Sequence, residues 1–162
     1  GELLPGLIQA LDALWEMRSR EGEALLANLK THLGEVETIL ADIEERAPRL
    51  VRLQRDRLRE RLAELLDNRL PDPARLEQEV ALLVERGDVT EECDRLRSHL
   101  AQFRGVLEEP GPQGRKLDFL LQEMHREVNT LGAKSADAML AHGVVELKTS
   151  IERLREQVQN LE

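Results

Sequence analysis

Aromatic residues are almost absent from this 162-residue chain, making up 2% of it, and tyrosine does not occur. Strands depend on aromatic and β-branched side chains, so a fold rich in β-structure is all but excluded. The abundant residues are leucine, glutamate, arginine and alanine, which are strong helix formers. The composition therefore predicts an all-α protein, with long hairpin-forming or coiled-coil-like helices and a C-terminal helical bundle.

Cysteine and long apolar runs are scarce as well. The single cysteine, Cys93, cannot form an intramolecular disulfide and fits a reducing compartment. No apolar run approaches the roughly 20 residues that cross a bilayer, and no signal-peptide pattern opens the chain. These absences predict a cytoplasmic protein with no membrane partner.

The sequence also lacks the motifs of common catalytic and metal sites. Its four histidines are scattered, and no two have the i, i+4 spacing of a helical zinc site. The 23 basic residues are outnumbered by 32 acidic ones, which gives a formal charge of −9. Such a chain repels nucleic acid on average, so contact with RNA or DNA requires a local basic stripe or another domain.

Apolar residues do recur at helical spacing through the first 43 residues. Leu7, Leu11 and Leu14 open a stripe that continues from Leu25 to Ile43 in steps of three and four. A helix of this length cannot bury its whole stripe within a compact bundle of 162 residues. Partner chains or further segments are expected to cover the stripe, which favours a helical scaffold that forms oligomers.

Proline and glycine mark the expected ends of helices. Pro48 is expected to break or kink the first helix, and residues 67–73, with two prolines, to form a loop. The strongest linker pattern is EEPGPQG at residues 108–114. The chain is thus predicted to divide into a long amphipathic region, 1–70, and a C-terminal helical domain, 73–162.

An arginine-rich stretch follows Pro48. Arg52, Arg55 and Arg59 fall on one helix face by three-four spacing, where they could follow a phosphate backbone. The alternative is a solvated face in which the arginines pair with nearby acids, namely Asp56, Glu60 and Glu64.

A second polar stretch covers residues 114–137. It comprises a helix predicted from Arg115 to about Leu131, with a buried face and two polar flanks, and the short connection GAKSAD. The buried face comprises Leu117, Leu120, Leu121, Met124, Val128 and Leu131. One flank carries Arg115, Asp118, Gln122, Arg126 and Asn129, and the other carries Lys116, Glu123, Glu127, Thr130 and Lys134. Carboxylates so spaced suit a hard divalent cation and the cations suit a phosphodiester, whereas the alternative is a set of ion pairs within one exposed helix.

Two long sequence motifs near the C-terminus resemble those of a known family. They are GRKLDFLLQEMHREVNTLGAKS at 114–135 and VVELKTSIERLREQVQNLE at 144–162, supported by residues 76–100 and, more loosely, QRDRL at 54–58. In this order they resemble the C-terminal region of the YicC-like endoribonuclease family. The chain departs from the family pattern at His125, which stands where the family usually has asparagine, and at Val128, Ala133 and Cys93.

The resemblance implies a bacterial cytoplasmic endoribonuclease that cleaves RNA with help from a divalent cation, Mn²⁺ or Mg²⁺. It also implies a homo-oligomer, expected to be a hexamer. Family members carry an N-terminal α/β domain, and this chain is expected to correspond to the helical C-terminal half without it.

The motifs that resemble the family contain residues whose chemistry suits RNA cleavage, and these are the candidate site residues. Asp118, Glu123 and Glu127 are expected to bind metal or act as general base, and Glu79, Glu91 and Glu92 form a second carboxylate cluster. Phosphate is expected at Arg115, Arg126 and Lys134, with Asn129 orienting water or ribose, and His99 is the reserve acid–base residue. Under the alternative hypothesis, the chain is a non-catalytic oligomerisation or RNA-binding module that supports an active site elsewhere.

Overall fold

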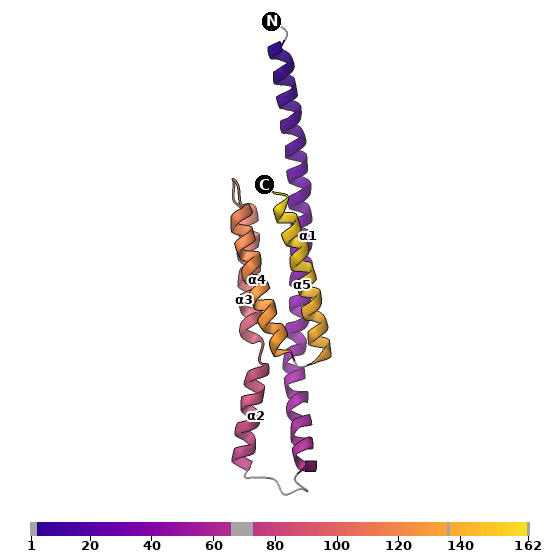
Figure 1. The fold of residues 1–162 in the computed structure, drawn as a ribbon, viewed down its shortest axis with the longest axis vertical. Coiled ribbons are helices and arrows are strands. Elements are labelled where there is room, and N and C mark those ends of the chain that lie inside the picture. The colour runs from indigo at the N-terminus through magenta and orange to yellow at the C-terminus, as the bar shows by residue number, and fades with distance from the viewer. Residues whose placement is uncertain (1–2, 66–72, 136, 162) are drawn as a thin grey trace.

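Five helices make up this computed structural model, which describes residues 3–65, 73–135 and 137–161. They are α1 (Leu3–Leu65), α2 (Pro73–Gly87), α3 (Thr90–Glu108), α4 (Gly114–Lys134) and α5 (Ala138–Gln159). Helix α1 runs the length of the molecule, with α2 beside its lower end and α3, α4 and α5 beside its middle (Figure 1). Because the described residues contain no strand, the all-α prediction is confirmed.

One apolar core joins α1 to the last three helices. Its members include Leu29, Leu33 and Val36 of α1, which pack with residues of α3, α4 and α5 such as Phe103 and Leu147. The predicted helical bundle is therefore completed by the middle of α1. The division at residues 70–73 stays a prediction, and the core itself draws on both sides of it.

The helix does not break at Pro48, since α1 passes through this residue without interruption, and the alternative of a kink stays a prediction. Proline removes one backbone hydrogen bond and crowds the preceding turn. Around it, however, Ile43 is buried in the core, and Ala47 and Leu50 pack against that core. Tertiary packing on both sides of the proline holds the helix together, as it commonly does for amphipathic helices. The loop predicted for residues 67–73 lies almost wholly outside the described residues.

The connections on either side of α4 are short and follow the sequence prediction. The α3–α4 turn contains Gly111 at φ +100°, a left-handed conformation that glycine adopts without the strain imposed by a Cβ atom. Asp137 then caps α5, its side chain accepting a hydrogen bond of 2.8 Å from the backbone N–H of Met139. These turns fold α3, α4 and α5 back on one another as antiparallel neighbours (Figure 1).

The N-terminal part of α1 projects beyond the bundle (Figure 1). The apolar side chains there are exposed, whereas the same stripe is buried from Leu29 to Ile43. The exposed members include Leu7, Leu11, Leu14, Trp15 and Met17. The prediction that this chain alone cannot cover the whole stripe is confirmed. No helix in the described ranges is both long and apolar enough to cross a bilayer.

Cys93 provides a test of this packing. Its side chain is buried at the start of α3, and burial, followed by the nearby carboxylates of Glu44 and Glu92, raises the pKa of the thiol to about 12. Because only the thiolate reacts quickly with alkylating agents, native Cys93 should resist iodoacetamide at pH 8 and react fully once the protein is unfolded in urea. Mass spectrometry of the alkylated protein measures both, and rapid modification of the native protein would contradict the packing.

Candidate functional site

Helix α4 buries one face and presents polar residues towards both neighbouring helices. All six residues of its predicted apolar face are buried, as is Glu127. One polar flank meets α3, and the other meets α5. The predicted two-flank arrangement is confirmed, and the alternative of ion pairs within the helix is not what is found. The ion pairs of α4 recorded in the described ranges reach residues outside the helix.

Two buried carboxylates lie between α3 and α4, and each has a cation beside it. Glu92 is 5% exposed, and Lys134 Nζ lies 2.8 Å from its Oε1 and 3.0 Å from its Oε2. Glu127 is also 5% exposed, and its Oε1 lies 3.4 Å from Arg95 Nη1. Burying a carboxylate without a paired cation costs folding free energy. These two contacts therefore favour a single alignment of α3 against α4.

Further polar contacts surround these two pairs. Arg95 also pairs with Glu91, and the charges of Glu91 and then Glu127 raise the pKa of the guanidinium above its ordinary value. At the entrance to α3, Asp88 accepts hydrogen bonds from the hydroxyl and backbone N–H of Thr90, at 2.6 and 2.9 Å. These bonds lower the pKa of the Asp88 carboxyl. The cluster is thus locked by hydrogen bonds at the end of the α3–α4 hairpin.

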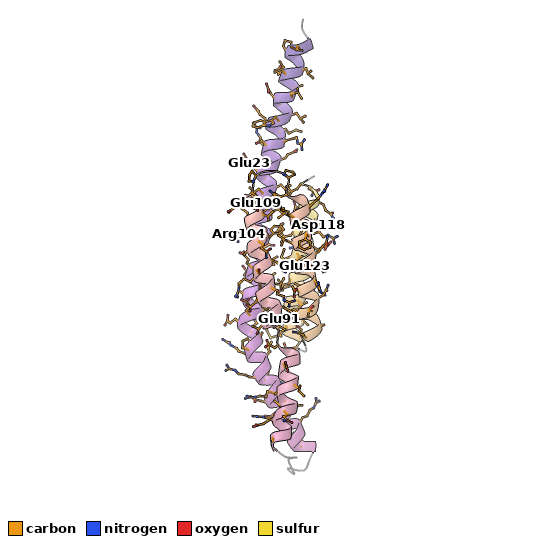
Figure 2. All side chains as sticks on the ribbon, turned by 90° about the vertical axis from the view of Figure 1, so that its left-hand side faces the viewer. Glu23, Glu91, Arg104, Glu109, Asp118 and Glu123 are labelled. Atoms are coloured by element: carbon orange, nitrogen blue, oxygen red, sulfur yellow. The ribbon has the colours of Figure 1, made fainter. Side chains whose placement is uncertain are left out.

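The same alignment determines the level of the other candidates. Helices α3 and α4 run antiparallel. His99 lies one turn after Arg95 on α3, and Glu123 lies one turn before Glu127 on α4, so the two residues fall at the same height along the hairpin. His99 is half-buried, and its Nδ1 has no hydrogen-bond partner within the described part of the chain. Figure 2 shows Glu123 between Asp118, towards one end of the bundle, and Glu91, towards the other.

On the other flank, α4 and α5 form a polar groove of about 450 Å³. We call it the α4–α5 groove; it is lined by Leu121, Gln122, His125, Arg126, Asn129, Thr130 and Arg155. The amide of Gln122 donates to Asp118 at 2.7 Å, and Asp118 lies 3.9 Å from Arg155. Asn129 lies 3.3 Å from His125 through their side-chain nitrogens. Amide, imidazole and guanidinium groups side by side can bind a phosphate and its ribose.

Arg155 is the member of this groove that sequence reasoning missed. Its Nε is buried without a hydrogen-bond partner in the described structure, and Asp118 and Glu152 are each 3.9 Å from its guanidinium. A side chain from α5 cannot be assigned to a site on α4 by spacing within one helix. The one sequence feature that could have indicated Arg155 is its position within the second family motif, residues 144–162.

The carboxylates expected to bind a metal do not come together. Asp118 faces α5, Glu127 faces α3 and is paired with Arg95, and Glu92 is paired with Lys134. The side chain of Glu79 lies outside the described part of the structure. Among the described residues, no three His, Cys, Asp or Glu side chains are grouped as metal ligands. The described carboxylates therefore do not form a metal site.

The arginine stripe of α1 lies apart from these α4 sites in its recorded contacts. Arg55 pairs with its neighbour Asp56 at 3.2 Å, which agrees with the solvated-face alternative for that residue. Arg52 lines a separate cavity of about 460 Å³ between α1 and the start of α3. Arg59 is exposed. A role for these three arginines in binding RNA stays a prediction.

The described residues thus form an all-helical bundle in which α4 carries polar side chains on both sides of its buried face. The family model described as "Endoribonuclease YicC-like, C-terminal" matches residues 43–162, well over half of the chain. The chain therefore belongs to the YicC-like endoribonuclease family, and its match includes all of α2 to α5.

Two curated relatives agree with this assignment. The chain is 40% identical over 154 residues to "Probable endoribonuclease YicC" of Clostridioides difficile (strain 630), covering 94% of this chain and 53% of the relative. It is 41% identical over 161 residues to the protein of the same name from Haemophilus influenzae (strain ATCC 51907 / DSM 11121 / KW20 / Rd), covering 99% of this chain and 55% of the relative. The chain thus spans about half the length of these relatives.

The Glu92–Lys134 pair gives a stability prediction. Replacing Lys134 with methionine leaves a buried carboxylate without its cation, and we expect the free energy of unfolding to fall by about 3 kcal/mol. Adding Glu92→Gln removes the unpaired charge and should recover most of the loss. Urea unfolding measures both variants, with the exposed Lys30→Met as control. Equal stability of wild type and Lys134→Met would contradict a structural role for the pair.

Proposed function

We propose that this chain is the helical, RNA-holding part of an endoribonuclease, which cleaves RNA phosphodiester bonds in the cytoplasm. The observation that carries the proposal is the outward ridge of α4, defined as Arg115, Gln122, Arg126 and Asn129. All four side chains are exposed, and within the described ranges neither arginine has an ion pair. Family membership supplies the reaction class.

The ridge has the length and spacing that a nucleic acid strand requires. Its residues recur at intervals of seven, four and three, which keeps them on one side of the helix. From Arg115 to Asn129 the helix rises about 21 Å, enough to contact several consecutive nucleotides. Arg126 also lines the α4–α5 groove, where Arg155 adds its guanidinium to the two guanidinium groups of the ridge. A phosphate backbone would neutralise the charges of Arg115 and Arg126, which have no ion pair within the described ranges.

Cleavage of RNA without a bound cofactor requires a base that removes the proton of the 2′-hydroxyl and an acid that protonates the leaving oxygen. Within this chain, the shared level of His99 and Glu123 supports these two residues as the acid–base pair. Asp118 and Glu127 were the other carboxylate candidates, and Glu127 is already occupied by Arg95. Assistance by Mn²⁺ or Mg²⁺ stays a prediction, which the cleavage assay below tests.

A second candidate function is oligomer assembly, and the exposed stripe at the start of α1 favours it. Leu7, Leu11 and Leu14 are each about half exposed, and Trp15 is 73% exposed. Apolar side chains at coiled-coil spacing commonly pair with another helix. We therefore propose a homo-oligomer, with the hexamer implied by the family resemblance as its expected size. The two functions are compatible, because the stripe and the α4 ridge are on different helices.

The cleavage proposal is tested on a labelled RNA with Mn²⁺, Mg²⁺ or EDTA, using this chain beside the full-length Haemophilus influenzae relative. We expect both to cleave, and His99→Gln or Glu123→Gln to lower the rate of this chain about 100-fold, the usual size of a lost acid or base. Light scattering checks that the oligomer is intact. Cleavage by the relative alone would make this chain a scaffold, and loss of cleavage in EDTA would show that a metal takes part.

The binding proposal is tested separately by fluorescence anisotropy with a single-stranded RNA. Replacing Arg126 and Arg155 with glutamine should weaken binding about 10-fold and lower the slope of log K against log salt by about 1 to 2, because each lost phosphate contact releases one counterion fewer. The matched control is Arg153→Gln, because Arg153 is an exposed arginine that lies on α5 with Arg155 but outside the α4–α5 groove. An unchanged slope in the double variant would show that this groove does not hold phosphate.

A further inference from the structure

An exposed aromatic ring lies on α4, in a chain that has only two phenylalanines and one tryptophan. Phe103 is fully buried in the core, whereas Phe119 is 60% exposed. Its neighbours Leu117, Leu120 and Leu121 are all buried, so the helix otherwise turns its apolar residues inward. A single exposed apolar side chain is common on protein surfaces, so a binding role for the ring depends on what lies beside it.

Phe119 borders a groove between the two arms of the α3–α4 hairpin. This hairpin groove has a volume of about 630 Å³; its lining includes Gln102, Gly105 and Val106 from α3 and Arg115, Phe119 and Leu120 from α4. Gly105 leaves space in this wall, since a Cβ atom built there would meet nothing within 4 Å. The groove therefore offers an aromatic face beside open room and a guanidinium one helical turn away.

The charges at this end of α4 favour an anion. Arg115 and Lys116 lie in the first turn of α4, where the helix dipole is positive and repels cations. Lys116 is compensated by Glu109 at 2.6 Å, but Arg115 has no ion pair in the described part of the chain. The cap residue Gln113 makes no side-chain hydrogen bond to the first turn. A phosphate at this position would pair with the guanidinium of Arg115 and lie at the positive end of the helix dipole.

We propose that the hairpin groove is a nucleotide subsite for single-stranded RNA, in which a base stacks on Phe119 and an adjacent phosphate binds Arg115. This inference rests on the proposed function and deepens it. Phe119 falls between Arg115 and Gln122 on the outer side of α4, so the subsite continues the α4 ridge. Aromatic rings alternating with cations are how proteins hold single strands without reading sequence, because every base has a face that can stack.

The surroundings of Phe119 favour RNA over a protein partner. Among the described residues of α3 and α4, Phe119 is the only large apolar side chain that is mostly exposed. One ring flanked by cations gives little apolar area for docking a helix, which requires a row of apolar side chains. Such a row is found instead at the start of α1, among Leu7, Leu11 and Leu14.

The test compares two probes, a twelve-nucleotide oligoadenylate RNA and a ribose-phosphate strand of equal length that lacks bases. Phe119→Ala should weaken binding of the oligoadenylate about 10-fold, within the range measured for lost base–aromatic stacking. It should not change binding of the abasic strand or the salt slope for either probe. Phe119→Trp, which keeps an aromatic face, should retain affinity. Met139→Ala, which alters an equally exposed apolar residue on α5, is the control.

Arg115→Gln supplies the complementary measurement. It should weaken binding of both probes and lower the salt slope, because it removes a phosphate contact and leaves the ring in place. Circular dichroism and light scattering of each variant report folding and oligomer size. A smaller oligomer in Phe119→Ala, with unchanged RNA affinity, would assign the ring to a protein interface and overturn the subsite.

The outcomes separate this inference from the function on which it rests. If the wild-type chain binds oligoadenylate and Phe119→Ala binds it equally well, the subsite is wrong and the RNA-holding function stands. Equal weakening of both probes by Phe119→Ala would also overturn base stacking. If wild type binds neither probe, the RNA-holding function fails and the subsite fails with it.

Discussion

The alignment of α3 against α4 is the constraint on which the rest of the site depends. Two buried carboxylates fix it, because Glu92 needs Lys134 and Glu127 needs Arg95 across the same helix interface. Sliding one helix by a turn would leave charges buried without partners, at a cost of several kcal/mol. The alignment in turn brings His99 level with Glu123 and places α3 residues beside the ring of Phe119. A structural ion-pair cluster at one end of the hairpin thereby sets which residues of α3 and α4 lie at the same height along it.

Helix α1 has a different task along each part of its length. Its middle supplies one wall of the core, and cross-helix ion pairs of Glu37 with Arg104 and Glu44 with Arg97 attach it to α3. Its N-terminal part has the same leucine spacing but no covering helix within the described structure. The repeating pattern therefore continues past the point where this chain can bury it. That continuation is the surface that the proposed assembly would use, and it lies on a different helix from the α4 ridge.

Much of the fold could be predicted from the spacing of apolar residues, because that local spacing indicates which face of an amphipathic helix is buried. The six apolar positions of α4 and the turn around Gly111 were predictable for this reason. The course of α1 through Pro48 was not, since tertiary packing outweighed a local breaking preference. The partners of the charged residues were also beyond the sequence. Lys134 has no acid three or four residues away on its own helix, and only the folded hairpin shows that its partner is Glu92.

The acidic character of the chain is compatible with the RNA binding at α4 that we propose. Charges in solution act over a Debye length, about 8 Å at physiological ionic strength, so acids elsewhere on the molecule are screened from a strand on the ridge. Several nearby carboxylates are already paired: Glu109 with Lys116, Glu127 with Arg95, and Glu92 with Lys134. A phosphate near Arg115 or Arg126 therefore meets a local cation rather than the average charge. The net charge of −9 affects long-range approach and its salt dependence, whereas the pairing pattern of the helix decides where a bound strand can lie.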